Sequence, residues 1–326
     1  MATVVERPVA ASEQARVAER RRNRRRSAWR RQWVALAFMS PWIIGFSAFY
    51  VYPMLSSLYF SLTRYDILSQ PKWVGLNNYR FMFTSDPLFW EAVRNTLWII
   101  AIMVPLQVVF AIATATVLTR LRSGLSFYRT VFFLPTMVPL VAAALGFIYI
   151  LNPAGPINRI LSAGHLPQPL WFLDPRWTKP GLVLIALWGI GQTMIIFLAS
   201  LLDVPRQLYE AAEIEGAKAW QQFRHVTLPM ISPVIFFSVL IGMIQGFQYF
   251  TQAFVISKAG DRTNEVGYPQ DSLLFYTSRL YQQGFEGFHM GYAAALSWVM
   301  FLVIMACTVA VIRSSRRWVH YQGGFR

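Results

Sequence analysis

Six apolar runs, each long enough to cross a bilayer, decide what this chain can fold into. Between their ends none contains Asp, Glu, Lys, Arg or His. A helix needs about 20 apolar residues to cross the hydrocarbon core, and only helices and closed barrels satisfy their backbone there. The sequence therefore predicts an all-α integral membrane protein with six transmembrane helices. We expect these at residues 33–60, 97–118, 131–151, 181–202, 234–256 and 291–312.

The chemistry of the remaining residues argues against an enzyme. Charged residues make up only 14% of the chain, which is typical of a membrane protein. Cys307 is the single cysteine, so no intrachain disulfide or cysteine-based metal site is expected. The four histidines lie in loops or at chain ends, and the phosphate-binding pattern G-x-x-x-x-G-K-[ST] does not occur. We therefore expect a chain that binds no metal or cofactor itself.

The basic residues predict the orientation. An even number of spans puts both ends on one side, and that side carries twice as many Lys and Arg residues as the other. Because these residues favour the cytoplasm, we expect cytoplasmic termini in a multi-pass protein of the cell (inner or plasma) membrane. Residues 1–31 form a basic tail that is predicted to be disordered, residues 32–314 the six-helix domain, and residues 315–326 a short basic tail.

The net charge of +15 does not indicate a nucleic-acid partner. A third of the basic residues lie within residues 1–31, directly before the first apolar run. An arginine run in this place is typical of an orientation signal that contacts anionic lipid headgroups. We therefore expect membrane lipid, and no nucleic acid, as its partner.

Residues 203–233 form a polar stretch between the fourth and fifth runs. Pro205 follows a candidate capping residue, Asp203, which predicts a short helix that ends near Gly216. A second short helix is predicted over residues 217–226, ended by Leu228-Pro229 because the residue before a proline disfavours the helical region. Spacing puts four residues on one face of the first helix: Leu208, Ala211, Ala212 and Glu215.

This stretch resembles the EAA loop of permease subunits in binding-protein-dependent ABC importers. The pattern is E-A-A, three residues, G, nine residues, then I or V-x-L-P, and Glu215 stands where the family usually has Asp. Further matching motifs, in the family's order, are Trp73–Tyr79, Asn95-Thr96, Arg129–Pro135 and Gly291–Ala295. Together they are similar to the carbohydrate-uptake branch, of the maltose-permease type.

The resemblance implies the ABC importer permease fold and a set of partners. These are a homologous second permease subunit, an ATP-binding cassette ATPase dimer that holds ATP and Mg, and an extracytoplasmic solute-binding protein. The loop is expected to dock into a groove on the ATPase. By resemblance, the coupling residues are Glu210, Ala211, Ala212, Glu215, Gly216, Ala217, Phe223, Leu228 and Pro229.

Polar side chains in the fourth and fifth runs are candidates for a substrate path. On a straight helix Gln245, Gln248, Tyr249 and Gln252 fall within about 100° of one another. Carboxamides bond sugar hydroxyls and aromatic faces cover the apolar side of a sugar ring, so this stripe indicates a sugar or polyol path. Trp188 and Gln192, four residues apart, form a similar pair.

Structural roles remain open for these residues. The glutamines also suit hydrogen bonds between helices, and Trp188 suits packing. The G-x-x-x-G spacing of Gly242 and Gly246 predicts that the fifth span packs closely against a neighbouring helix.

Three alternative functions fit parts of the sequence. An ABC permease for another solute, such as glycerol phosphate or a peptide, fits the loop, but a phosphate favours cationic residues along the path. An ion-driven secondary carrier usually needs titratable groups at mid-membrane, and the runs contain none. A membrane-anchored signalling protein needs a soluble effector domain, for which no loop is long enough.

Overall fold

The computed structural model describes residue 29 and residues 31–121, 123–260 and 266–319. The chain divides into two units, one up to Tyr59 and one from Phe60 onward. The predictions for residues 1–28 and 320–326 lie outside the described residues.

The first predicted span is one long helix, Arg31–Ser61, which contains nearly all of the described residues of the first unit. It contains a π-helical turn, η1 (Ser47–Val51), and continues as α2 (Tyr52–Ser61). Pro53 lacks an N–H and crowds the preceding turn, and a wider turn relieves that crowding. Three rings stack along the helix, with centroids 5.2 Å apart for Trp42 and Phe46 and 5.6 Å apart for Phe46 and Tyr50.

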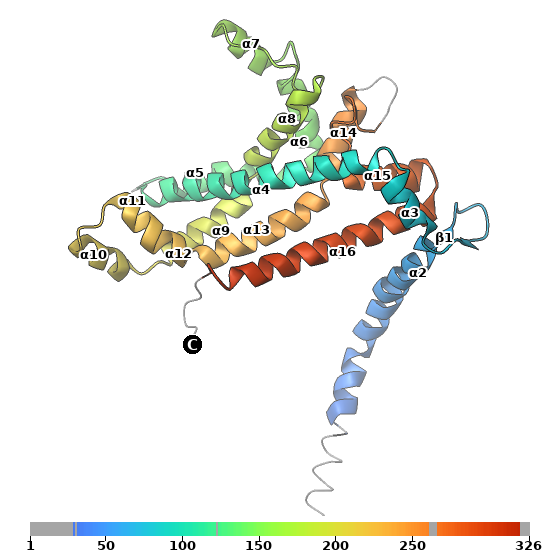
Figure 1. The fold of residues 1–326 in the computed structure, drawn as a ribbon. Coiled ribbons are helices and arrows are strands. Elements are labelled where there is room, and N and C mark those ends of the chain that lie inside the picture. Colours follow the sequence, from blue (N-terminus) through green and yellow to red (C-terminus); the bar gives the residue numbers. More distant parts are fainter. Residues whose placement is uncertain (1–28, 30, 122, 261–265, 320–326) are drawn as a thin grey trace, which may run out of the picture. The chain divides into compact units, whose positions relative to one another are not determined.

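The second unit is a helical bundle built around α4 (Phe89–Thr119). Helices α4, α9 (Gly191–Leu202), α13 (Ser232–Phe247) and α16 (Met290–Ser315) lie side by side (Figure 1). We call the end that carries residues 203–231 the loop end, and the end that carries residues 62–88 and 266–289 the far end.

Short elements complete the second unit. At the far end, β1 (Thr63–Arg64) pairs antiparallel with β2 (Lys72–Trp73). The other far-end elements are α3 (Asn77–Thr84), α15 (Tyr276–Tyr281) and η4 (Gln282–Glu286). Those of the loop end are α10 (Arg206–Ile214), α11 (Ala219–Gln222), η3 (Phe223–Thr227) and α12 (Leu228–Met230). The remaining elements are α5 (Leu125–Phe133), η2 (Leu134–Met137), α6 (Leu140–Ile150), α7 (Pro156–Ala163), α8 (Pro175–Trp188) and α14 (Thr251–Gly260).

The third and fourth predicted spans are bent helix pairs. Leu125–Met137 and Leu140–Ile150 meet at 99°, and α8 and α9 meet at 51°. The first bend has a local cause, since Val138 precedes Pro139 and takes an extended conformation, with ψ 127°. The sequence patterns did not predict these bends, but the six predicted spans each correspond to a helix or a bent pair among the described residues.

The fifth predicted span is interrupted as well. Helix α13 ends at Phe247 and α14 begins at Thr251, so Gln248–Phe250 are not helical. The predicted stripe of polar residues assumed a straight helix, and this geometry was wrong because the stripe crosses the interruption.

The close approach predicted for Gly242 and Gly246 is confirmed, and the neighbour is α4. A Cβ atom on Gly246 would lie 2.6 Å from Cγ1 of Ile100, and one on Gly242 would lie 3.0 Å from Cγ1 of Val104. Only glycine fits at position 246, so α13 and α4 pack closely against each other.

The Asn95-Thr96 motif holds the far end together. Asn95 Nδ2 donates to the carbonyl oxygens of Asp271 (2.8 Å) and Leu274 (2.9 Å), and the Tyr276 amide donates to Thr96 Oγ1 (2.9 Å). These side chains are buried in α4 and supply hydrogen-bond partners to a loop that is not part of a helix or sheet. The motif is therefore a structural anchor for residues 271–276.

Candidate functional site

A cavity of about 470 Å³ lies within the second unit, where three spans break. Its wall includes Pro135 and Val138 at the bend of the third span, Gly189 at the bend of the fourth, and Gln248–Thr251 at the interruption of the fifth. Met103, near the middle of α4, lies on the same wall. Backbone freed from helical hydrogen bonds is tolerated at membrane depth where it lines a cavity, and transporter sites are often built this way.

The structure brings all six predicted path residues to this cavity. They are Trp188, Gln192, Gln245, Gln248, Tyr249 and Gln252. Gln192, Gln245 and Gln248 are exposed, so their carboxamides are available to a solute. Each carboxamide offers two N–H donors and an acceptor oxygen, which suits a ligand with many hydroxyl groups.

Gln107 is a lining residue that the sequence analysis missed. Its Nε2 donates to the Ala186 carbonyl (3.2 Å), one turn before the bend of the fourth span. It therefore joins α4 to α8 and also lines the cavity. A lone carboxamide in a long apolar run was the available signal, but no second polar residue at helical spacing supported it. Thr136, Phe250 and Thr251 also line the cavity and were missed.

The two aromatic candidates have mixed roles. The Tyr249 ring packs edge to face against Phe275, with centroids 5.5 Å apart, and its hydroxyl is enclosed without a hydrogen-bond partner among the described residues. The Trp188 ring contacts Phe147 at 5.6 Å and remains partly exposed. Both residues pack against the core and border the cavity. Trp188 thus makes a packing contact, and its role in a substrate path stays a prediction.

The cavity is polar without being charged. Within the described part of the chain, none of its lining residues is Asp, Glu, Lys, Arg or His. Over those same residues, no group of three or more His, Cys, Asp or Glu side chains is placed to hold a metal ion. The wall thus presents neutral hydrogen-bonding groups and ring faces.

The polar loop forms two short helical segments that meet at Gly216. Its φ of +77° belongs to the left-handed region, and the Ala217 amide donates to the Ala212 carbonyl at 2.9 Å. This hydrogen bond and conformation end α10 in the manner that favours glycine. The predicted break at Gly216 is confirmed.

Two details of the loop prediction were wrong. Asp203 ends α9 and does not cap α10, whose N-cap position is Pro205. The second segment does not stop at Leu228-Pro229, because helical structure runs from Ala219 through Met230. Pro229 is tolerated since the π-helical turn η3 precedes it and it lies in the first turn of α12, where its N–H is not needed.

The predicted coupling residues divide by exposure. Glu210, Ala211, Glu215, Gly216 and Leu228 are exposed, whereas Ala212, Ala217, Phe223 and Pro229 are half-buried. Four residues were predicted to share one face of the first loop helix. Of these, Ala212 is partly covered, whereas Leu208, Ala211 and Glu215 are exposed and can contact a partner.

Tyr209 and Phe223 join the loop to the bundle, and the role of Tyr209 was missed. Both pack against the apolar cluster that contains Phe197 of α9. The Tyr209 hydroxyl lies 2.9 Å from Thr227 Oγ1 and so ties α10 to η3. Phe223 stacks on Trp220 at 5.6 Å, and Trp220 is 68% exposed. The loop therefore has a face on the bundle and an exposed face with apolar character.

Comparison with known proteins shows to which family the chain belongs. Residues 107–320 match the family model described as "Binding-protein-dependent transport system inner membrane component". The chain belongs to this family. Among its relatives, the probable ABC transporter permease protein YesP of Bacillus subtilis is 39% identical, over 88% of this chain and 91% of its own. The lactose transport system permease protein LacF of Rhizobium radiobacter is 33% identical, over 82% and 89%.

Solved structures show the same fold for this permease. A bacterial ABC transporter involved in the import of the acidic polysaccharide alginate matches with a TM-score of 0.76 at 24% identity, over 90% of this chain and 99% of that one. The family resemblance and the permease fold are thus confirmed. The chain is a multi-pass membrane protein and a transport subunit of an ABC system, not an enzyme.

Proposed function

We propose that this permease forms half of the path through which an ATP-driven importer carries a neutral sugar or related polyol. The observation that carries the proposal is the convergence of three helix breaks on one uncharged cavity lined by five glutamines. The name of the relative LacF, which refers to lactose transport, supports the sugar class.

The cavity favours a neutral solute over the alternatives. A glycerol phosphate carries charge that favours cationic side chains, whereas this wall supplies carboxamides, hydroxyls and rings. A peptide has charged ends with the same requirement. An ion-driven carrier usually needs a buried Asp, Glu, Lys, Arg or His at the site, and none of these is among the lining residues within the described ranges.

We propose that the loop at the end of α9 docks on the ATPase and transmits its motion to the bundle. Its exposed face contains Glu210, Ala211 and Glu215, with the small Ala211 permitting close approach by an ATPase that holds ATP and Mg. Its other face packs on the bundle through Tyr209 and Phe223. ATPase closure then displaces α9, whose first turn borders the cavity at Gln192. Such coupling is reciprocal, so solute loading also changes the affinity for ATP.

The proposed orientation puts the loop end and both termini in the cytoplasm, with the N-terminal arginines against lipid headgroups. The far end then meets an extracytoplasmic binding protein. Gln192, Gln245 and Gln248 are exposed on this chain, and we assign the missing wall of the path to a homologous second permease subunit.

The test is reconstitution in liposomes with the second permease, the ATPase and the binding protein. We expect uptake of a radiolabelled neutral oligosaccharide that requires ATP and the binding protein, is blocked by vanadate and is insensitive to proton uncouplers. Uptake of glycerol 3-phosphate in preference to every neutral sugar would refute the solute class. Uptake without the ATPase would refute the mechanism.

A further inference from the structure

We propose that a run of four aromatic side chains, leading from the cavity towards the far end, is a second sugar subsite that takes up the solute before it reaches the cavity. We call Phe250, Phe254, Tyr281 and Phe285 the aromatic strip. This inference rests on the proposed function and goes beyond it, because three of the four rings lie outside the cavity wall.

The rings of the strip are in continuous contact. Phe250 stacks on Phe254 with centroids 4.9 Å apart, and Tyr281 lies 5.4 Å from Phe250 and 5.0 Å from Phe254. Phe285 then stacks on Tyr281 at 5.4 Å. Phe250 is also a lining residue of the cavity, so the strip begins inside the proposed path.

The strip joins two elements that approach each other through their side chains. Phe250 immediately precedes α14 and Phe254 lies within it, four residues apart, whereas Tyr281 ends α15 and Phe285 lies in η4. The π-helical turn η4 is of a kind that is frequently found at functional sites. Here it carries both Phe285 and Glu286.

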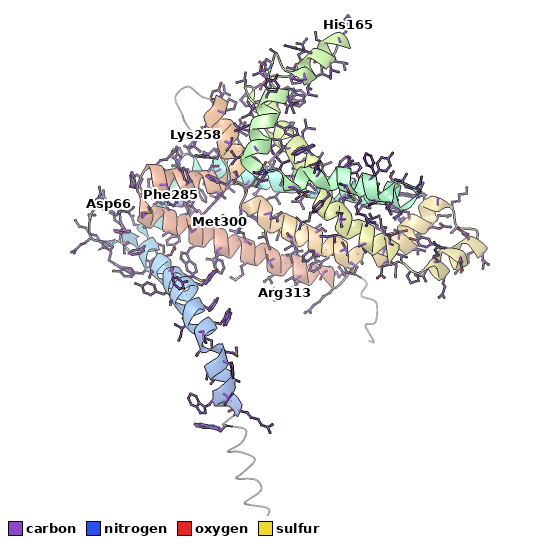
Figure 2. The ribbon with its side chains drawn as sticks, turned by 180° about the vertical axis from the view of Figure 1, so that it is seen from behind. Asp66, His165, Lys258, Phe285, Met300 and Arg313 are labelled. Carbon is purple, nitrogen blue, oxygen red and sulfur yellow. The ribbon has the colours of Figure 1, made fainter. Side chains whose placement is uncertain are left out.

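The strip is accessible at its outer end. Phe285 is 60% exposed, and Phe250, Phe254 and Tyr281 are half-buried. Aromatic side chains present large apolar areas that a ligand can cover. Figure 2 labels Lys258 on α14 and Phe285 in η4.

An ion pair borders the strip. Lys258 Nζ lies 3.0 Å from Glu286 Oε1 and 5.6 Å from the centre of the Phe254 ring. Ring faces next to paired charges suit a sugar, whose C–H face covers a ring while its hydroxyls bond the ammonium and the carboxylate. The pair thus places a hydrogen-bond donor and an acceptor beside the rings of the strip.

The experiment compares Phe285→Ala with a matched control in the reconstituted four-component importer. Phe288→Ala removes a ring of similar exposure (53%) three residues away, and Phe288 is not part of the strip. The readouts are the sugar concentration dependence of uptake and co-elution with the second permease subunit. We expect Phe285→Ala to raise KM about two- to tenfold with an unchanged maximal rate, in line with the strength of aromatic contacts.

Further variants sharpen the result. Phe285→Tyr keeps the ring and should restore the wild-type KM, and Phe288→Ala should leave it unchanged. Equal KM values for Phe285→Ala and Phe288→Ala would overturn the subsite. Loss of co-elution in Phe285→Ala would also overturn it, because the strip would then be an interface between permease subunits. Wild-type complexes that import no sugar would refute the proposed function itself, and the subsite with it.

Discussion

Arg279 and Asp86 form a buried ion pair although 193 residues separate them in the chain. Arg279 Nη2 lies 2.8 Å from Asp86 Oδ1 and Nε lies 3.2 Å from Oδ2, while the Tyr292 hydroxyl donates to Oδ2 at 2.6 Å. The Leu88 amide donates to Oδ1 at 3.0 Å. One carboxylate thus connects the residues before α4, α15 and the start of α16.

Breaking this ion pair should destabilise the far end strongly. We expect Asp86→Ala to reduce the free energy of unfolding by about 3–5 kcal/mol, because it leaves the Arg279 guanidinium buried without its partner. Arg94→Ala is the control, since Arg94 is exposed and its ion pair with Glu91 lies at the surface, so a loss of about 0–1 kcal/mol is expected. Thermal unfolding in nanodiscs measures both, and equal losses would contradict the prediction.

Gly291 should be intolerant of any side chain. A Cβ atom there would lie 2.1 Å from the Thr63 carbonyl oxygen, and the Gly291 amide donates to the Tyr65 carbonyl at 3.1 Å. Gly291→Ala should therefore cost about 1–3 kcal/mol of stability through overpacking. Gly146→Ala in α6 meets open space and should be neutral or stabilising by up to ~1 kcal/mol. A normal unfolding temperature for Gly291→Ala would show that α16 shifts freely.

Changes in the loop should uncouple the ATPase without unfolding the bundle. Gly216→Pro cannot adopt the φ of +77°, and Glu210→Lys reverses an exposed charge. We expect both variants to lose co-purification with the ATPase and ATP-dependent uptake, while Gln207→Ala, exposed on the same helix, keeps both. Wild-type uptake in either variant would exclude the loop as the docking element.

Gln248→Ala should weaken transport and leave assembly intact. Its carboxamide is exposed at the interruption of the fifth span, so its loss removes hydrogen bonds to solute without opening the core. A hydrogen bond contributes about 0.5–1.5 kcal/mol, which predicts a rise of KM of about two- to tenfold. Gln168→Ala, an exposed carboxamide in the loop after α7, is the control. Unchanged uptake kinetics for Gln248→Ala would assign this glutamine to helix packing.

Sequence patterns located the spans, the break at Gly216 and the tight packing of Gly242 and Gly246, because each depends on short-range chemistry. Long uncharged runs require a membrane, a positive φ favours glycine, and small residues at helical spacing permit close approach. The six path residues also emerged from local patterns, because polar side chains in apolar runs are costly unless they face other helices or a cavity.

The helix interruptions and the far-end ion pair did not emerge from these patterns. Gln248–Phe250 contains no proline or glycine, so the break depends on tertiary packing against neighbours such as Phe275. Asp86 and Arg279 lie in polar segments, where charges usually face water, and only the fold brings them together. Gln107 was missed because its partner is a backbone carbonyl of another span.

The glycine that begins α9 has a mechanical consequence. A Cβ atom on Gly191 would lie 2.2 Å from the Phe132 carbonyl oxygen, so the top of α9 touches bare main chain of the neighbouring segment. Because main chain meets main chain at this contact, we expect α9 and the segment that contains Phe132 to move together. A displacement of α9 should therefore shift the cavity walls of the third and fourth spans in a single step.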